Sequence, residues 1–360
     1  MKGPLTHFPV TKTKVSGLTK KFDLTDVQQR KEYFEAKAGP EIAKLKKYFK
    51  TSTFVAYLLG KKNSGKGTYT KLMMEIFGKD KIGHISVGDL VRETHKIIED
   101  PKEKQELVKY LKQHYRGYIS VEDAFDALIG KNQKVLLPTE FILTLVKREI
   151  DRFDHKVVFL DGFPRDLDQI QYSLYFRDLI NYRLDPDIFV AINIPESVLD
   201  ERMRNRVVCP ICHAPRNLTV FATKKVGFDE KTKKFFLKCD NQECNGARMA
   251  GKEGDEAGIE SIRDRLELDD KLIKKVMSLH GIPKILLRNA VPVNSIKDNI
   301  VDDYEITPKY VYKRDDKTGE ITTSEEPWII KDDEGADSFS LVAAPVVVGL
   351  LKQLVQALEL

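Results

Sequence analysis

A glycine-rich stretch at residues 60–68, with the sequence GKKNSGKGT, carries the clearest chemical signal in the chain. It follows the pattern G-x-x-x-x-G-K and continues with Gly-Thr. Glycines let the backbone curl so that successive N–H groups point at phosphate oxygens, beside a helix N-terminus that favours negative charge. In such a loop Lys66 would reach the β- and γ-phosphates of a nucleotide, and the Thr68 hydroxyl would lie near Mg²⁺. The alternative is an ordinary strand–turn–helix that contains two glycines by chance.

A second signal follows the apolar residues 157–160, which end at Asp161. An aspartate at the end of a strand beside a phosphate loop is where Mg²⁺ is held, usually through water. Gly162 would permit the close approach of a ligand, and Arg165 is a candidate clamp for phosphate. Arg92 lies one turn into a helix that could hold a second anion at its N-terminus, although a solvent-facing arginine is the commoner explanation.

The cysteines form two pairs, Cys209–Cys212 and Cys239–Cys244. The first pair has the C-x-x-C spacing of structural zinc sites, whereas the second has four residues between its cysteines. Four clustered cysteines indicate a metal site in a reducing compartment better than disulfides. His213 and Asp240 are possible substitute ligands, and two unpaired thiol pairs are the alternative.

The flanks of the phosphate loop have the patterns that such a site requires. Residues 53–59 form an apolar run of strand length, and apolar residues recur at helical spacing over 72–77. The apolar runs predict an α/β fold with a parallel sheet. Further strands are expected at 81–86, 157–161 and 187–193. Arg202 and Arg206 lie four residues apart after the last of these, so both would project from one face at the end of a helix.

The two ends of the chain carry weaker signals. A helix is expected over about residues 24–49, broken at Gly39-Pro40, as a docking helix or a flexible arm. Near the other end, the pattern predicts a hairpin at 310–322 and a last sheet strand at 328–330. A closing helix at 340–358 would bury Val347, Leu351, Leu354 and Leu358 on one stripe.

Composition bounds the remaining possibilities. The 360 residues include 60 basic and 55 acidic side chains, a net charge of +5 that does not argue for nucleic acid. No signal-peptide pattern is present at the N-terminus, and the longest apolar run, 341–351, is too short to span a bilayer. With the cysteine pattern of a reducing compartment, these features lead us to expect a cytoplasmic protein with neither nucleic acid nor membrane as a partner. We also expect a monomer.

Four motifs together resemble the adenylate kinases. Residues 60–68, 85–92, 161–169 and 201–206 occur in the order seen in that family, and the resemblance covers about residues 53–268. The Asp-Gly-Phe-Pro-Arg sequence at 161–165 is the most specific of them. The resemblance implies a P-loop parallel sheet with a helical insertion for a nucleoside monophosphate (NMP) and a small zinc-bound β lid. It also implies Mg-dependent, reversible transfer of the ATP γ-phosphate to AMP, giving two ADP.

The same resemblance assigns roles residue by residue. The implied catalytic cations are Lys66, Arg165, Arg206 and Arg265. The implied ATP-binding residues are Gly60, Asn63, Ser64, Gly65, Lys66, Gly67, Thr68 and Arg202. The implied AMP-binding residues are Val87, Gly88, Arg92, Leu137, Gly162, Arg165, Gln169 and Arg265. Mg²⁺ would be held through water by Thr68 and Asp161, and Zn²⁺ by Cys209, Cys212, Cys239 and Cys244.

The resemblance also suggests a division of the chain into parts. Residues 1–50 would be an N-terminal extension and 88–153 the NMP-binding insertion. Residues 207–256 would be the lid, and 51–87, 154–206 and 257–360 would form the core with C-terminal additions.

Three departures from the family pattern leave the function less sharply defined. Lys62 and Asn63 replace the usual proline and glycine of the phosphate loop, and Lys61 and Lys62 would add charge nearby. Val87 stands where threonine is common, so a different acceptor (GMP, UMP or CMP) or GTP as donor is possible. The family has a further phosphate-binding arginine after the lid, and this chain has no arginine at the matching position. Arg248 or Lys252 could take its place. The chain could also be a non-catalytic nucleotide-binding protein, or a nucleic-acid-binding protein that uses its four cysteines as a zinc ribbon.

Overall fold

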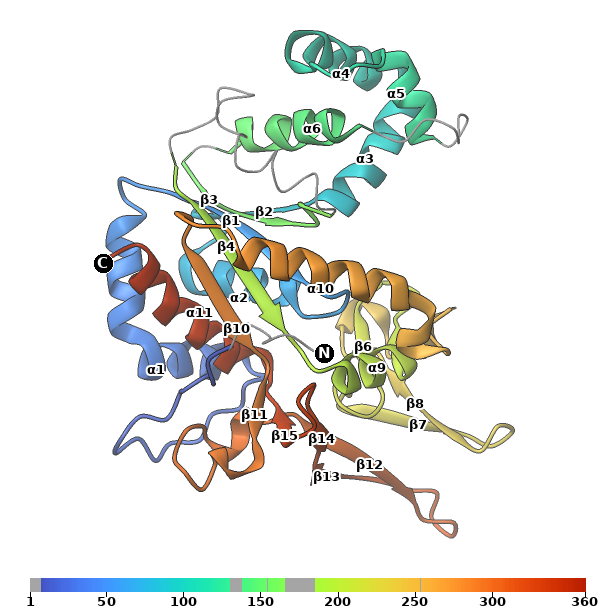
Figure 1. Cartoon of the computed structure of the whole chain (residues 1–360). Coiled ribbons are helices and arrows are strands. Elements are labelled where there is room, and N and C mark those ends of the chain that lie inside the picture. The colour runs from blue at the N-terminus through green and yellow to red at the C-terminus, as the bar shows by residue number, and fades with distance from the viewer. Residues whose placement is uncertain (1–7, 130–137, 154, 166–184, 253) are drawn as a thin grey trace.

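The computed structural model describes residues 8–129, 138–153, 155–165, 185–252 and 254–360. Its centre is a five-stranded sheet in the order β10-β4-β1-β3-β2 (Figure 1). The strands are β1 (Val55–Gly60), β2 (Ile82–Ser86), β3 (Val157–Asp161), β4 (Asp187–Asn193) and β10 (Lys284–Arg288). Every neighbouring pair is parallel, so the predicted α/β class with a parallel sheet is confirmed.

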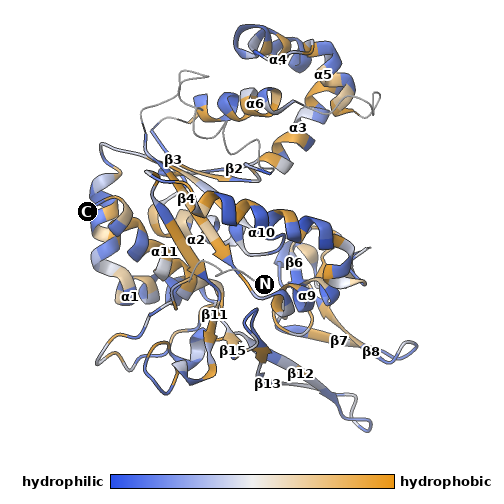
Figure 2. Cartoon of the chain, viewed as in Figure 1, coloured by the Kyte–Doolittle hydropathy of each residue, from blue (hydrophilic) through white to orange (hydrophobic). Residues whose placement is uncertain are grey.

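Strand β1 shows why the sheet is buried on both faces. Its side chains alternate between two hydrophobic clusters, as the pleat requires, with Ala56 and Leu58 in one and Val55, Tyr57 and Leu59 in the other. The first cluster includes apolar residues of α1 (Val27–Tyr48), α2 (Lys66–Phe77) and α11 (Ala343–Ala357). The second includes residues of α10 (Arg263–Met277) and of the helices between β2 and β3. Figure 2 shows β4 and β10 as largely apolar ribbons between these layers.

The segment between β2 and β3 is helical, as predicted. It contains α3 (Val87–Glu99), α4 (Pro101–His114), α5 (Val121–Leu128) and α6 (Thr139–Asp151), beyond one edge of the sheet (Figure 1). Local capping explains the boundaries, because Ser86, Asp100 and Ser120 accept backbone N–H groups at the starts of α3, α4 and α5.

The cysteine-containing segment follows α9 (Glu196–Arg204) and is built from short strands. These are β5 (Arg206–Val208), β6 (Pro215–Asn217), β7 (Lys225–Asp229), β8 (Lys234–Lys238) and β9 (Ala250–Gly251). Residues 219–221 form no strand, since only Phe221 makes an isolated bridge, to Asn217. Strand β7, which pairs with β8, was not predicted. We call this segment, residues 206–251, the lid.

A long insertion separates β10 from α11. Strands β11 (Ala290–Pro292), β14 (Ile329–Lys331) and β15 (Asp337–Ser340) form a small antiparallel sheet, and β12 (Pro308–Arg314) pairs with β13 (Ile321–Pro327) as the predicted hairpin. The prediction that residues 328–330 complete the central sheet is wrong. Strand β14 buries only Ile330, which suits a surface sheet rather than a strand covered on both faces.

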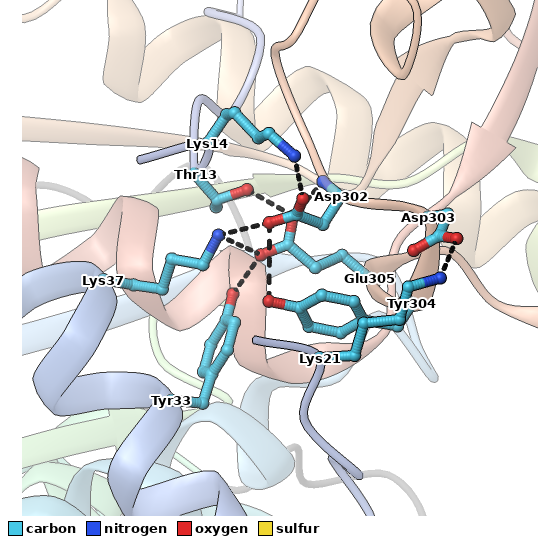
Figure 3. A network of polar contacts seen from close by, with 9 residues as sticks. All are labelled: Thr13, Lys14, Lys21, Tyr33, Lys37, Asp302, Asp303, Tyr304 and Glu305. Atoms are coloured by element: carbon cyan, nitrogen blue, oxygen red, sulfur yellow. Dashed lines mark hydrogen bonds and ion pairs between the residues drawn. The ribbon is translucent and has the colours of Figure 1, made fainter. Parts of the chain in front are cut away.

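A buried polar network fastens the N-terminal extension to this insertion (Figure 3). Tyr33 Oη donates to Glu305 Oε1 at 2.6 Å, and Lys37 Nζ lies 2.5 Å from Asp302 Oδ2. Helix α1 also bends at Ala38, just before the Gly39-Pro40 pair at which the sequence predicted a break. The extension is therefore a docked helix rather than a flexible arm. Within the described residues, no helix is both long and apolar enough to cross a membrane.

Candidate active site

The phosphate loop lies between β1 and α2 and uses left-handed backbone at two positions. Asn63 has φ +66° and Gly65 has φ +98°, so asparagine adopts the conformation that favours glycine. A Cβ atom on Gly60 would lie 2.8 Å from Ser64 Oγ, which explains glycine at the end of the strand. The unusual sequence of this loop is therefore compatible with a cradle of phosphate-loop shape.

Polar groups inside the loop are arranged as an anion site. Lys66 Nζ donates to the carbonyl of Gly60 at 2.7 Å and lies 3.8 Å from Asp161 Oδ1. Burial lowers the pKa of Lys66, although the nearby Asp161 carboxylate opposes that shift. Within the part of the chain that the structure describes, Asn63 Nδ2 and Ser64 Oγ are buried without a hydrogen-bond partner. Buried donors without partners are uncommon, and phosphate oxygens would satisfy them.

A cavity of about 410 Å³ opens beside this loop, between β1, β3 and α10. Its walls bring together cations from three separate parts of the chain: Lys66, Arg165 and Arg265. Its full lining is Leu58, Leu59, Gly60, Lys62, Asn63, Lys66, Asp161, Gly162, Pro164, Arg165, Arg265, Asp269, Leu272 and Ile273. A pocket of this size with converging cations can hold polyphosphate.

Arg165, which lines the cavity, and Arg92 both approach Gly88. A Cβ atom at Gly88 would lie 3.3 Å from Arg165 Nη2 and 3.6 Å from Arg92 Nη1. Gly162 has φ +88°, and a Cβ atom there would lie 2.9 Å from Arg165 Nη2. The side chain of Arg92 is 70 % exposed and forms an ion pair with Asp89. This arrangement forms a second candidate anion site.

Four further predicted residues are placed less centrally or not at all. Val87 is buried at the start of α3 and offers no hydroxyl. Thr68 is exposed on α2 and does not line the cavity. Leu137 and Gln169 lie outside the described residues.

Arg202 and Arg206 converge, but not in the way that their spacing predicted. Helix α9 ends at Arg204, so Arg206 belongs to β5 and the prediction of a shared helix face is wrong. Arg202 Nη1 nevertheless donates to the carbonyl of Asn63 at 3.2 Å, and Arg206 Nη1 donates to Asn63 Oδ1 at 3.1 Å. Both arginines therefore reach the phosphate loop, Arg202 from the end of α9 and Arg206 from the start of the lid.

The residues considered as replacements for a lid arginine lie elsewhere. Arg248 pairs with Asp229 at 2.6 Å and covers the ring of Phe236, so its contacts are with other residues of the lid. Lys252 is exposed.

Lys61 was expected to add positive charge near the phosphates. It is instead buried between Glu196 at 3.2 Å and Asp270 at 3.3 Å, which neutralise it.

The four cysteines come together as a candidate metal centre. The Sγ atoms of Cys209, Cys212, Cys239 and Cys244 all lie within 4.8 Å of one another, and neither His213 nor Asp240 belongs to the cluster. Hydrogen bonds from the backbone N–H groups of Cys212 and Ile211 help to lower the pKa of the Cys209 thiol to about 6. Four converging thiols fit the tetrahedral thiolate shell of structural zinc, which itself deprotonates its ligands.

Asp269 lines the cavity but was not predicted as a site residue. It follows Arg265 by one helical turn on α10, and its side chain is only 7 % exposed. The spacing of four residues between the two was visible in the sequence and could have indicated the pair.

Together, a phosphate loop, an aspartate at the end of β3 and a second arginine-lined anion site define a P-loop phosphotransferase. Comparison with known proteins makes this class more specific. No protein-family model matches the chain. An adenylate kinase from Thermotoga neapolitana is 28% identical over 237 residues, which cover 65% of this chain and 89% of the relative.

Two other relatives are more similar over shorter stretches. The adenylate kinase of Thermotoga maritima is 33% identical over 174 residues, 48% of this chain and 67% of the relative. That of Clostridium botulinum is 32% identical over 215 residues, 59% of this chain and 80% of the relative. The chain belongs to the adenylate kinase family, and thereby to the nucleoside monophosphate kinases.

Proposed function

We propose that this protein transfers the γ-phosphoryl group of ATP reversibly to AMP, giving two ADP. The single observation that carries the proposal is the convergence of Lys66, Arg165 and Arg265 on one cavity beside the phosphate loop. The relatives, which are adenylate kinases, support ATP and AMP as the two substrates.

The proposed mechanism relies on charge rather than on a general base. The transferred phosphoryl group passes through a loose transition state with charge spread over its oxygens, so preorganised cations supply most of the stabilisation. Lys66 would bind the donor phosphates at the loop. Arg165 and Arg92, which meet at Gly88, would hold the acceptor phosphate, and Arg265 would meet the transferred group between them.

Mg²⁺ would accompany ATP, and Asp161 fits it with a partly exposed carboxylate in the cavity wall beside Lys66. Thr68 is exposed on α2 outside the cavity lining, so its hydroxyl would contribute through water. When bound, Mg²⁺ would neutralise charge on the β- and γ-phosphates.

We further propose that α3 to α6 form the acceptor-binding part and that the lid carries structural zinc. Arg202 on α9 and Arg206 at the start of the lid would cover the donor nucleotide, since both already reach Asn63. Lid closure, carried over from the family, would exclude water and so favour transfer over hydrolysis.

A second acceptor remains a candidate because of Val87. Its buried apolar side chain removes a hydroxyl near the proposed acceptor base, so GMP, UMP or CMP could replace AMP.

A coupled assay with an acceptor panel tests these proposals. AMP, GMP, UMP and CMP are compared at one fixed concentration of MgATP, and we expect ADP formation to be fastest with AMP. Lys66→Met should abolish turnover, because the loop loses its cation. Lys71→Met, which removes an exposed lysine of the same helix, is the matched control and should retain it. Faster turnover with another monophosphate would reassign the acceptor. ATP binding without turnover of any monophosphate would refute the proposal.

A further inference from the structure

Asp269 is a negative charge placed inside a group of cations that should bind anions. Its carboxylate lies in the cavity wall with Lys66, Arg165 and Arg265. Burying a carboxylate is costly unless it is paired, and its presence opposes the binding of phosphate nearby. Because Asp269 is costly to bury and also opposes phosphate binding, we expect this carboxylate to have a function in the site.

The partner of Asp269 is Arg265. Arg265 Nε lies 3.0 Å from Asp269 Oδ1, one helical turn apart on α10. Nε makes this contact, and within the described residues no hydrogen bond of the two terminal nitrogens of the guanidinium is found, so these nitrogens are available to another anion. The side chain of Arg265 is 41 % exposed, so without this contact it could adopt other rotamers.

The adjacent carboxylate fixes the rotation of the helix. Asp270 Oδ1 lies 3.3 Å from Lys61 Nζ of the phosphate loop, and Lys61 also pairs with Glu196 at 3.2 Å. Consecutive side chains of α10 therefore contact two different parts of the site. Asp270 fastens the helix to the loop, and this fastening sets the position from which Asp269 holds Arg265.

We propose that Asp269 is a positioning residue for phosphoryl transfer, which holds Arg265 at the cavity wall with its terminal nitrogens directed to the transferred phosphate. This inference rests on the proposed function, and it identifies a residue that tunes that same site. It implies two opposite effects of removing Asp269. Nucleotides should bind more tightly because a negative charge is lost, whereas transfer should slow because Arg265 is no longer held.

Asp269→Leu in the full-length protein tests the proposal. We expect kcat to fall about tenfold or more, since small misplacements of a catalytic group are costly, while KM for ATP stays equal or falls. Asp269→Asn keeps an oxygen that can accept from Nε, so it should lose less kcat. Asp264→Asn, an exposed carboxylate of the same helix, is the matched control. Circular dichroism establishes that each variant is folded.

A double-mutant cycle gives the decisive outcome. In an Arg265→Lys background, Asp269→Leu should change kcat by less than about threefold, because the group that it positions is gone. An equal loss of kcat in both backgrounds, or no loss in either, would overturn the proposal. The same cycle can also be measured as ATP affinity by calorimetry. If no monophosphate is turned over, the proposed function fails, but the calorimetric cycle still tests the positioning role. Coupling between residues 265 and 269 in ATP binding would then support that role, and additive effects of the two substitutions would refute it.

Discussion

Replacing Lys37 with methionine tests whether the polar network of Figure 3 stabilises the fold. The Lys37 side chain is fully buried, with its Nζ 2.5 Å from Asp302 Oδ2 and 3.7 Å from Glu305 Oε1. Methionine has nearly the same length and fills the space, so the main change is the loss of one positive charge. Glu305, itself fully buried, then loses its ion pair with Lys37, whereas Asp302 keeps its ion pair with Lys14.

The magnitude follows from this geometry. With an effective dielectric constant of about 20, a pair of unit charges about 3.7 Å apart interacts by about 4 kcal/mol. Breaking a buried pair by removing one partner costs about 3–5 kcal/mol, because the remaining charge stays buried. Lys20→Met is the matched control, since Lys20 pairs with Glu32 at the surface, with side chains 57% and 43% exposed. Its cost should stay below about 1 kcal/mol.

Urea denaturation followed by the fluorescence of Trp328 measures both variants. Trp328 is the only tryptophan of the chain and lies in the insertion that Lys37 holds. With a slope of about 3 kcal/mol/M, Lys37→Met should lower the midpoint by about 1 M or more. A midpoint for Lys37→Met within error of that for Lys20→Met would refute the reasoning.

Three further predictions concern the lid, the cavity and acid stability. Cys244→Ser should lower bound zinc from one ion per chain to a small fraction, measured by atomic emission in reducing buffer; a wild-type protein without zinc would contradict the assignment. Gly162→Ala should reduce kcat, because the left-handed backbone and the close approach of Arg165 both disfavour a Cβ atom; full activity would contradict this. Burial alone would raise the pKa of Asp302, but the hydrogen bonds and charges of Lys14 and Lys37 lower it overall. The ionised Asp302 carboxylate therefore stabilises the folded state above pH about 4, and this stabilisation is lost as the pH falls through the folded-state pKa. The stability difference between wild type and Asp302→Asn should therefore narrow in acid, and a constant difference in urea titrations at several pH values would contradict it.

Local signals were sufficient for the parallel sheet and the phosphate loop. Continuous apolar runs predicted β1, β3 and β4 with boundaries close to those observed, because strands buried on both faces need continuous apolar sequence. The phosphate loop forms despite its unusual sequence, because asparagine tolerates the left-handed backbone that Asn63 adopts.

Side-chain partnerships across the fold could not be predicted in this way. Lys61 looked like added charge for phosphate, but its partners, Glu196 and Asp270, come from helices far along the chain. Arg206 was placed on a helix face because spacing alone does not show that α9 ends at Arg204. The prediction that residues 328–330 join the central sheet was wrong for a related reason, since a short apolar segment does not specify which sheet it joins.

The hairpin β12–β13 gives the lid a contact that lies outside the phosphate site. Tyr312 Oη donates to the carbonyl of Leu218 at 2.6 Å, and the ring of Tyr312 lies 5.4 Å from that of Phe235. Arg314 forms an ion pair with Glu230 and covers the ring of Phe228, so the contact has polar and aromatic parts.

The hairpin belongs to the same insertion that Lys37 fastens to α1. Any rotation of the lid on the sheet must therefore either break these contacts or carry the hairpin with it. Contacts thus connect the N-terminal extension to the insertion and the insertion to the lid. Through these contacts the extension and the insertion are linked to the part that covers the proposed ATP site.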